Sequence, residues 1–553
     1  LHSTLTNLKS IYLQIMKNIH LLFFMALSIL LTVEGAAQSY NPILPLWEYI
    51  PDGEPYVFED PDNPGKFRVY LYGSHDMLKT VYCGLDQVVW SAPVEDMGQW
   101  RYDGVIFQSR LDAQGKPLNP NGAGDLLYAP DVTMVTGADG KKTYYLYPNN
   151  QHGGRNTMVA KSSRPDGPFE VCNWHPTNPR ETVGVLGFDP AVFVDDDGRV
   201  YGYWGFDTSY GGEMDPSNMA SLLPGTEAVK DMGSSRKQEG DFRFFEASSI
   251  RKIKNKYVFV YSRWTKDGEF GLEGTNYTLA YAYGDKPLGP FVYGGTIIDA
   301  RGREKQPDGT VRPTATPGGN THGSILEIGG QWYVFYHRQI GTNEFSRQAM
   351  VAPISVEVTE GPGGKVVISE GEYTSEGFRT AGLDLFQTYP AGIACHYTGP
   401  QASAHQYPNK IYSGSYIKAT YFEGDPTKAP SDLVLRSNPV VNNTAGSIIG
   451  YKYFNFSQAP SNGETMFELE MLPAGVEGSI DIMAVSPDAN RGGILLGTVA
   501  VHNTPILQPV VVRTPVKNLN QVSGKQPLYL VIKAKETNVS IGDIYHFGFV
   551  RQQ

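Results

Sequence analysis

The segment GFDPAVFVDDDGRVYGYWGFD, residues 187–207, has the form of a β-hairpin. Its Asp-Gly turn separates two alternating apolar segments, a pattern typical of two antiparallel strands joined by a tight turn. A carboxylate, Asp189, stands just before the first strand. A single Asp in that place is most often a turn residue, so this segment by itself does not indicate a functional site.

The same hairpin pattern recurs five times along the chain. The first strands are EPYVF, DVTMV, DPAVF, EASSI and HGSIL, which begin at Glu54, Asp131, Asp189, Glu246 and His322. A second strand with a shared tyrosine follows each turn, at Tyr70, Tyr145, Tyr201, Tyr257 and Tyr333. The polar residues are 77, 58, 57 and 76 residues apart and the tyrosines 75, 56, 56 and 76, so the two markers keep step. Repeats of this length predict the four-stranded blades of a five-bladed β-propeller.

The five polar residues that begin the repeats are expected to lie together. If each begins the innermost strand of its blade, all five point into one end of the central channel. Four of them are acidic, and clustered carboxylates repel one another and are costly to desolvate. The cluster therefore indicates a functional site. Two separated carboxyl groups, one protonated and one ionised, are the groups that hydrolyse a glycosidic bond, and a third can raise the pKa of the acid.

Composition and charge restrict the class of protein. The chain has 553 residues, enough for one large and one small domain. Its net charge of -11 argues against a nucleic-acid partner, because phosphates require a basic face. Only Cys83, Cys172 and Cys395 are present, which is neither a disulfide framework nor a zinc motif.

The amino terminus is expected to be an export signal. From Met16 the chain has a basic Lys17, an apolar stretch at residues 21–33, and small residues at Gly35 and Ala37 that suit a signal peptidase. The apolar stretch is shorter than the roughly 20 residues of a membrane span. We therefore predict that residues 1–37 are upstream residues and a signal peptide, that the protein has no integral membrane span, and that it is periplasmic or extracellular.

The repeat stops near residue 375, and residues 376–553 have a different pattern. Segments such as ETMFELEML, GSIDIMAVS and PLYLVIKAK read as short strands between Gly, Pro and Asn turns. This pattern is typical of a β-sandwich of the jelly-roll kind. The predicted fold class is thus all-β, with a propeller over residues 38–375 followed by a sandwich.

Residues of about 40–370 resemble glycoside hydrolase family 43, the five-bladed propeller enzymes that act on arabinose- and xylose-containing plant polysaccharides. The segment FDPAVFVDDDG is similar to the one that holds the family's pKa-modulating Asp, here Asp189, and FFEASSIRKIKNKYVFVYS is similar to the general-acid segment, here Glu246. The resemblance implies that catalysis requires no cofactor. It also implies that His322, in THGSILEIGG, is the residue near a structural Ca²⁺ or other cation where one is bound on the propeller axis.

The segment PDGEPYVF departs from the family pattern, which places the general-base Asp directly before a Pro. Here Glu54 precedes the Pro, and Asp52 lies two residues earlier. Strand alternation would point both side chains the same way. Repeat register favours Glu54 as the base and the family's residue preference favours Asp52, so both stay open. Asp131, in YAPDV, resembles a segment near the family's sugar site and is expected to contact or support the substrate; a structural hydrogen bond is the alternative.

Three more residues are candidates for substrate binding: Trp204, Trp264 and Arg338. They stand at or just beyond the ends of the second strands, where they would stack on a sugar face or bind hydroxyls. Packing between blades is the alternative for the two aromatic residues.

The order of strands in the sandwich resembles a family 6 carbohydrate-binding module. All seven Trp residues lie at or before Trp332, so this domain has none with which to stack on sugar, and a structural role packed against the propeller is the alternative. The sequence as a whole predicts an exported, inverting glycoside hydrolase that removes terminal sugars from plant polysaccharides or oligosaccharides. An α-L-arabinofuranosidase is favoured; β-xylosidase, exo-β-galactosidase and a non-catalytic sugar-binding propeller are the alternatives. The sequence does not define an oligomeric state.

Overall fold

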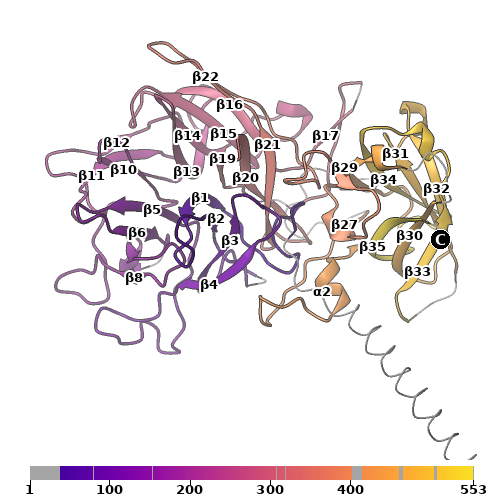
Figure 1. Cartoon of the computed structure of the whole chain (residues 1–553), viewed down its shortest axis with the longest axis horizontal. Coiled ribbons are helices and arrows are strands. Elements are labelled where there is room, and N and C mark those ends of the chain that lie inside the picture. The colour runs from indigo at the N-terminus through magenta and orange to yellow at the C-terminus, as the bar shows by residue number, and fades with distance from the viewer. Residues whose placement is uncertain are drawn as a thin grey trace, which may run out of the picture.

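The computed structural model describes residues 38–551 except for residues 79, 152, 307, 318, 401–413, 460–464 and 504–506. The predicted signal peptide lies outside the described residues. The described chain forms two parts, a set of blades drawn in indigo to pink and a sandwich drawn in orange to yellow (Figure 1). The predicted fold class, a five-bladed propeller followed by a sandwich, is confirmed.

Each blade is an antiparallel sheet in which strands pair in chain order. The first blade is β1 (Glu54–Glu59), β2 (Phe67–Tyr72), β3 (Gln87–Pro93) and β4 (Arg101–Phe107). The second is β5 (Asp131–Thr136), β6 (Lys142–Tyr147), β7 (Ala160–Ser162) and β8 (Glu170–Val171), and the third is β9 (Ala191–Val194), β10 (Val200–Trp204), β11 (Tyr210–Met214) and β12 (Val229–Lys230). The fourth is β13 (Phe244–Ile253), β14 (Lys256–Arg263), β15 (Thr278–Gly284) and β16 (Val292–Asp299), and the fifth is β19 (Ser324–Ile328), β20 (Gln331–Gln339) and β21 (Arg347–Ile354).

The first strand of each blade lies innermost. Strand β9 contacts both β5 and β13, and β19 contacts both β13 and β1. The Tyr56 hydroxyl of β1 donates to Asp131 of β5, so the five inner strands form a ring. These strands begin with short turns and continue as alternating or continuous apolar segments, whose side chains fill the space between neighbouring blades. The turn before each inner strand therefore faces one end of the central channel.

The fifth blade is completed by the start of the described chain. The main-chain N–H of Ile43 donates to the carbonyl of Ala349 in β21. The Asn41 side chain donates to the carbonyls of Val351 and Thr374 and accepts from the N–H of Val351. Residues 41–43 thus lie along the outer edge of β21 and join the two ends of the propeller.

The sandwich consists of two sheets. The first pairs β24 (Leu383–Asp384), β29 (Ile448–Asn455), β34 (Lys525–Ala534), β31 (Gly478–Ala484) and β32 (Ile494–Val501), with β26 (His396–Thr398) added on β29. The second pairs β27 (Tyr416–Ile417), β28 (Val440–Val441), β35 (Gly542–Arg551), β30 (Thr465–Pro473) and β33 (Val510–Pro515), with β25 (Tyr389–Pro390) added on β35. The short helix α2 (Leu433–Ser437) and two hairpins, β17 (Glu304–Lys305) with β18 (Val311–Arg312) and β22 (Val356–Val358) with β23 (Val366–Ile368), complete these elements.

The propeller and the sandwich share one hydrophobic core. The propeller residues Tyr40, Leu46, Tyr49 and Ile340 belong to the same buried cluster as the sandwich interior. We call this cluster, with those four propeller residues and the apolar residues of both sandwich sheets, the joint core. The predicted boundary at residue 375 falls in the segment between β23 and β24.

None of the helices in the described ranges has the length and apolar character that a membrane crossing requires.

Candidate active site

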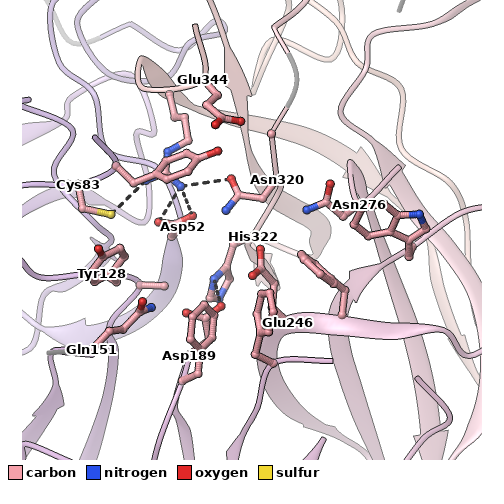
Figure 2. Close-up of a pocket in the computed structure, with 18 residues that line it drawn as sticks. Asp52, Cys83, Tyr128, Gln151, Asp189, Glu246, Asn276, Asn320, His322 and Glu344 are labelled. Carbon is pink, nitrogen blue, oxygen red and sulfur yellow. Dashed lines mark hydrogen bonds and ion pairs between the residues drawn. The ribbon is translucent and has the colours of Figure 1, made fainter. Parts of the chain in front are cut away.

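A cavity of about 590 Å³ opens at the end of the channel where the inner strands begin. Its walls include five of the predicted site residues, namely Asp52, Asp189, Glu246, Trp264 and His322. In Figure 2 the side chains of Asp52, Asp189 and Glu246 converge on this cavity from different parts of its wall. Asp52 and His322, which are 270 positions apart in the sequence, therefore belong to one site.

The pocket-lining residues occupy equivalent positions in the repeat. Asp52, Ala129, Asp189 and His322 line the cavity, and each stands two residues before the first residue of an inner strand. Asp52 and Asp189 both have left-handed backbone conformations, with φ of 59° and 47°. This register corrects the sequence alignment of the repeats: the equivalent of Asp189 in the first blade is Asp52, and Glu54 is already the first residue of β1. The alternation of side chains along a strand was expected to point Asp52 and Glu54 the same way. It does not apply to Asp52, because this residue lies before β1 and not within it.

Glu246 reaches the same cavity by a different local structure. It is the third residue of β13, and the pairing of β13 with β14 is irregular on both sides of it. The next residue, Ala247, has φ of 66°. A β-bulge of this kind bends the strand and changes the direction of a side chain, and it directs Glu246 toward the pocket.

Asp52 is buried and surrounded by donors. Both of its carboxylate oxygens accept from the Arg347 guanidinium, at 3.0 and 3.1 Å, and one accepts from the Ser74 hydroxyl at 2.5 Å. Burial acts to raise the pKa of Asp52, but these donors and the neighbouring His337 outweigh burial and hold that pKa below its usual value. Asp52 is therefore ionised at neutral pH.

Asp189 and Glu246 form a pair of buried carboxyl groups with the opposite behaviour. Burial and then the charge of Glu246 raise the pKa of Asp189 well above its usual value. Burial and then the charge of Asp52 raise the pKa of Glu246 to about 8. Two neighbouring buried carboxyls titrate as a unit and resist losing both protons, so the pair retains a proton at neutral pH.

Glu54 and Asp131 do not line the pocket and form a second buried cluster. The Arg251 guanidinium donates to Glu54 at 2.8 Å, and the Tyr56 hydroxyl donates to Asp131 at 2.6 Å. Asp131 also accepts from the main-chain N–H of Val192 at 2.6 Å, which ties the second blade to the third. Asp131 therefore connects the second blade with its two neighbours, whereas Glu54 of the first blade pairs with Arg251 of β13 in the fourth blade.

His322 faces the pair from the fifth blade. Its Nδ1 atom lies 3.6 Å from an Asp189 oxygen that also accepts from the N–H of Ala247. Burial lowers the pKa of His322 below its usual value, so the ring is neutral. Within the part of the chain that the structure describes, no group of three or more His, Cys, Asp or Glu side chains could hold a metal ion.

The three remaining residues that were predicted to bind substrate lie in different parts of the molecule. Trp264 lines the pocket, where its ring meets Phe245 edge-on at 5.1 Å. Trp204 does not line this pocket; it stacks on Tyr210 at 5.7 Å within the third blade. Arg338 is fully buried and donates to carbonyls of Gly392 and Ala394 in the sandwich, so its expected place at the sugar site is corrected to one between the two domains.

The sequence did not reveal several residues that complete the site. Arg347 holds Asp52, Asn149 donates to Asp189 at 2.8 Å, and His337 accepts from the N–H of Asp52. The other ring nitrogen of His337 faces the carbonyl of Asn320 at 2.8 Å, which assigns the proton to Nε2. Arg347 begins an apolar strand, and its neighbours in the sequence do not show whether its side chain is buried or at the surface. No local signal distinguished it.

These features define a class of protein. One carboxylate is ionised, a nearby carboxyl pair retains a proton, and both face a single cavity, an arrangement suited to acid–base hydrolysis of a glycosidic bond.

Comparison with known proteins defines the family. The model of Glycosyl hydrolases family 43 matches residues 58–358, more than half of the chain, and the chain belongs to this family. It is therefore a glycosidase that hydrolyses O-glycosyl bonds.

Two relatives and one solved structure illustrate the similarity. The chain is 35% identical to the xylosidase/arabinosidase of Thermoclostridium stercorarium over 76% of this chain and 83% of that protein. It is 32% identical to xylosidase/arabinosidase 43A of Humicola insolens over 49% of this chain and 84% of that protein. A solved family 43 arabinoxylan arabinofuranohydrolase from Bacillus subtilis is 20% identical, with a TM-score of 0.43 over 93% of this chain and 98% of that one.

Proposed function

We propose that this glycosidase removes terminal sugars from plant polysaccharides or their oligosaccharides with inversion of the anomeric centre, and that its main activity is that of an α-L-arabinofuranosidase. The observation that carries the proposal is the difference in proton affinity across one pocket. Asp52 is held ionised by Arg347 and Ser74, whereas the Asp189–Glu246 pair retains a proton. A single displacement requires one carboxylate to accept a proton and one carboxylic acid to donate one.

The hydrogen bonds support an assignment of roles. Asp189 accepts from Asn149 and from the main-chain N–H of Ala247, and such donors favour its ionised form. On this basis we assign the proton of the pair to Glu246. In the reaction, Asp52 takes a proton from the attacking water, the new bond forms at the anomeric carbon, and Glu246 gives its proton to the departing glycosidic oxygen. Asp189 keeps Glu246 protonated between turnovers.

Substrate choice within this class rests on the relatives. Two of them carry the names of both a xylosidase and an arabinosidase. These names support a terminal pentose as the sugar removed, and they make β-xylosidase the second candidate. The exo-β-galactosidase alternative has less support. The departure from the family pattern at Asp52 and Glu54 is the feature that keeps a non-catalytic sugar-binding propeller as an alternative. The Asp52 carboxylate at the pocket argues against that alternative.

The test is sugar release by the purified protein from a panel of aryl glycosides and arabinose- or xylose-containing oligosaccharides. Proton NMR follows the anomer that forms first. Release of arabinose with inverted configuration is the expected result. Retained configuration would contradict the single displacement, and release of xylose alone would favour the second candidate.

The same panel tests Glu246 as the acid. Glu246→Gln keeps the shape of the side chain but has no acidic proton. We expect hydrolysis of substrates with poor leaving groups to fall by about 10²–10⁴-fold, the usual contribution of a general acid. Aryl glycosides with acidic phenols need less protonation and should lose less activity. Equal losses on both kinds of substrate would argue against this role.

Two further expectations belong to this proposal. We propose that the sandwich is a carbohydrate-binding module of the family 6 kind; its two-sheet fold is consistent with that role. Retention of the Glu246→Gln protein on insoluble arabinoxylan, with the active site filled by free pentose, is the test. We also propose export through residues 1–37, which cell fractionation and sequencing of the mature amino terminus would check.

A further inference from the structure

The sandwich touches the loop that carries the strongest partner of Asp52. This loop, residues 340–346, joins β20 to β21 and ends directly before Arg347. The N–H of Gly341 donates to the carbonyl of Ile417 at 2.9 Å, and the hydroxyls of Ser346 and Tyr421 share a hydrogen bond of 2.5 Å. Ser346 is fully buried. The sandwich thus holds both ends of this loop.

Space at this contact is limited. Gly341 has φ of +78°, and a Cβ atom built on it would lie 2.9 Å from the Cβ of Ala419. The two backbones therefore approach each other more closely than side chains would allow. A contact of this kind fixes the loop relative to the sandwich.

The same part of the sandwich reaches the other partner of Arg347. The N–H of Thr420 donates to the Tyr49 hydroxyl at 3.0 Å, and the Tyr49 and Tyr421 rings lie 5.6 Å apart. The carbonyl of Tyr49 accepts from the N–H of Asp76 at 3.0 Å. Asp76 in turn binds the Arg347 guanidinium through both of its oxygens, at 2.9 Å each.

Arg347 is where the two sets of contacts meet, one through the 340–346 loop and the other through Asp76. Its guanidinium contacts Asp76 on one side and both oxygens of Asp52 on the other, and all three residues are at most 3% exposed. A buried guanidinium with two carboxylate partners has little freedom to adjust. A shift of the 340–346 loop or of Asp76 would therefore move the donors that hold Asp52.

We propose that Thr420 and Tyr421 of the sandwich are positioning residues for the catalytic base, acting on Asp52 through Ser346 and Arg347 and through Tyr49 and Asp76. The inference rests on the proposed function, since it takes Asp52 as the base. It assigns the sandwich a part in turnover of every substrate, small ones included. The pocket lining itself comes from the propeller, and the sandwich acts on it indirectly.

The charge around Asp52 sets the expected readout. The titratable and charged groups that face it come from all the neighbouring elements: Arg347, His337, His322, Asp76, Cys83, Asp189 and Glu246. Arg347 provides the positive charge of this set. If Arg347 is held less firmly, it stabilises ionised Asp52 less. The pKa of Asp52 then rises, and the base becomes protonated at higher pH.

Tyr421→Phe tests the inference, because it removes one hydroxyl and keeps the ring packed on Tyr49. With an aryl glycoside, we expect kcat to fall by up to about tenfold, the effect that one hydrogen bond can have. The acidic limb of kcat/KM should move to higher pH, while KM and the melting temperature change little. Ser346→Ala removes the other hydroxyl and should behave alike, and the double variant should be no worse than either single one.

Tyr453→Phe is the matched control. Its hydroxyl also bridges the domains, donating to Glu372 at 2.8 Å, but Glu372 lies outside the 340–346 loop, whereas the Tyr421 partner Ser346 belongs to it. It should keep the wild-type pH profile. An unchanged pH profile in both Tyr421→Phe and Ser346→Ala would overturn the inference, and so would an equal change in the control. If Tyr421→Phe does not fold, Ser346→Ala decides alone. An inactive wild-type protein would refute the proposed function, and this inference with it. An active wild-type protein with unchanged variants would refute the inference alone.

Discussion

Asp52 and Glu54 are two residues apart and experience different surroundings. Asp52 faces the cavity beside Arg347, whereas Glu54 pairs with Arg251 inside the propeller. Asp52→Asn should therefore lower kcat by about 10²–10⁴-fold and leave substrate binding intact. Glu54→Gln should leave the buried Arg251 without a full counter-charge and cost about 3–5 kcal/mol of unfolding free energy.

Kinetics and denaturant unfolding of both variants check this contrast. The reverse pattern, with an inactive Glu54→Gln protein of normal stability, would make Glu54 the base.

The Asp189–Glu246 pair predicts the alkaline limb of the pH profile. The base must be ionised and the acid protonated, so activity is lost below the pKa of Asp52 and above that of Glu246, which is raised to about 8. In the proposed assignment Asp189 is the ionised member of the pair, so Asp189→Asn removes a negative charge next to Glu246 and should lower the pKa of Glu246. The alkaline limb of kcat/KM should consequently move to lower pH. A limb that stays in place would show that Asp189 does not act on the proton of Glu246.

The local structure of the inner strands directs side chains of the repeated segments into one pocket. The turn two residues before a strand supplies Asp52, Asp189 and His322, and the bulge in β13 brings in Glu246. The repeat spacing revealed that these segments are equivalent. It did not reveal where each strand begins, because a shift of two residues preserves the alternation of side chains.

The closure of the fifth blade predicts a stability effect without a kinetic one. Asn41 is 1% exposed and makes three hydrogen bonds to β21 and its neighbour. Asn41→Ala should leave these buried groups unsatisfied and lower the unfolding free energy by about 2–4 kcal/mol. Asn121→Ala, which loses one contact in an exposed turn, is the control and should change little. Denaturant unfolding measures both, and equal effects would contradict the closing role of Asn41.

The joint core predicts that the two domains unfold together. Leu46, Tyr49 and Ile340 of the propeller are at most 2% exposed within a cluster made mainly of sandwich residues. Removing the sandwich would expose this apolar surface, and such patches favour aggregation. Calorimetry of the full chain should show one transition, and a fragment of residues 38–375 should be insoluble. Two separate transitions, or a soluble and active fragment, would show that the propeller is independent.

The sequence alone determined the fold class, the five repeats, and the identity of Asp189 and Glu246 as carboxylates of one site. These follow from side-chain alternation, turn residues and repeat spacing, which are properties of neighbouring residues. Only the tertiary structure decided that Asp52 and not Glu54 faces the pocket, that Arg338 lies between the domains, and that Arg347 holds Asp52. Arg347 and Asp52 are 295 residues apart. A contact over that distance is fixed by ring closure and burial, and these leave no local pattern in the chain.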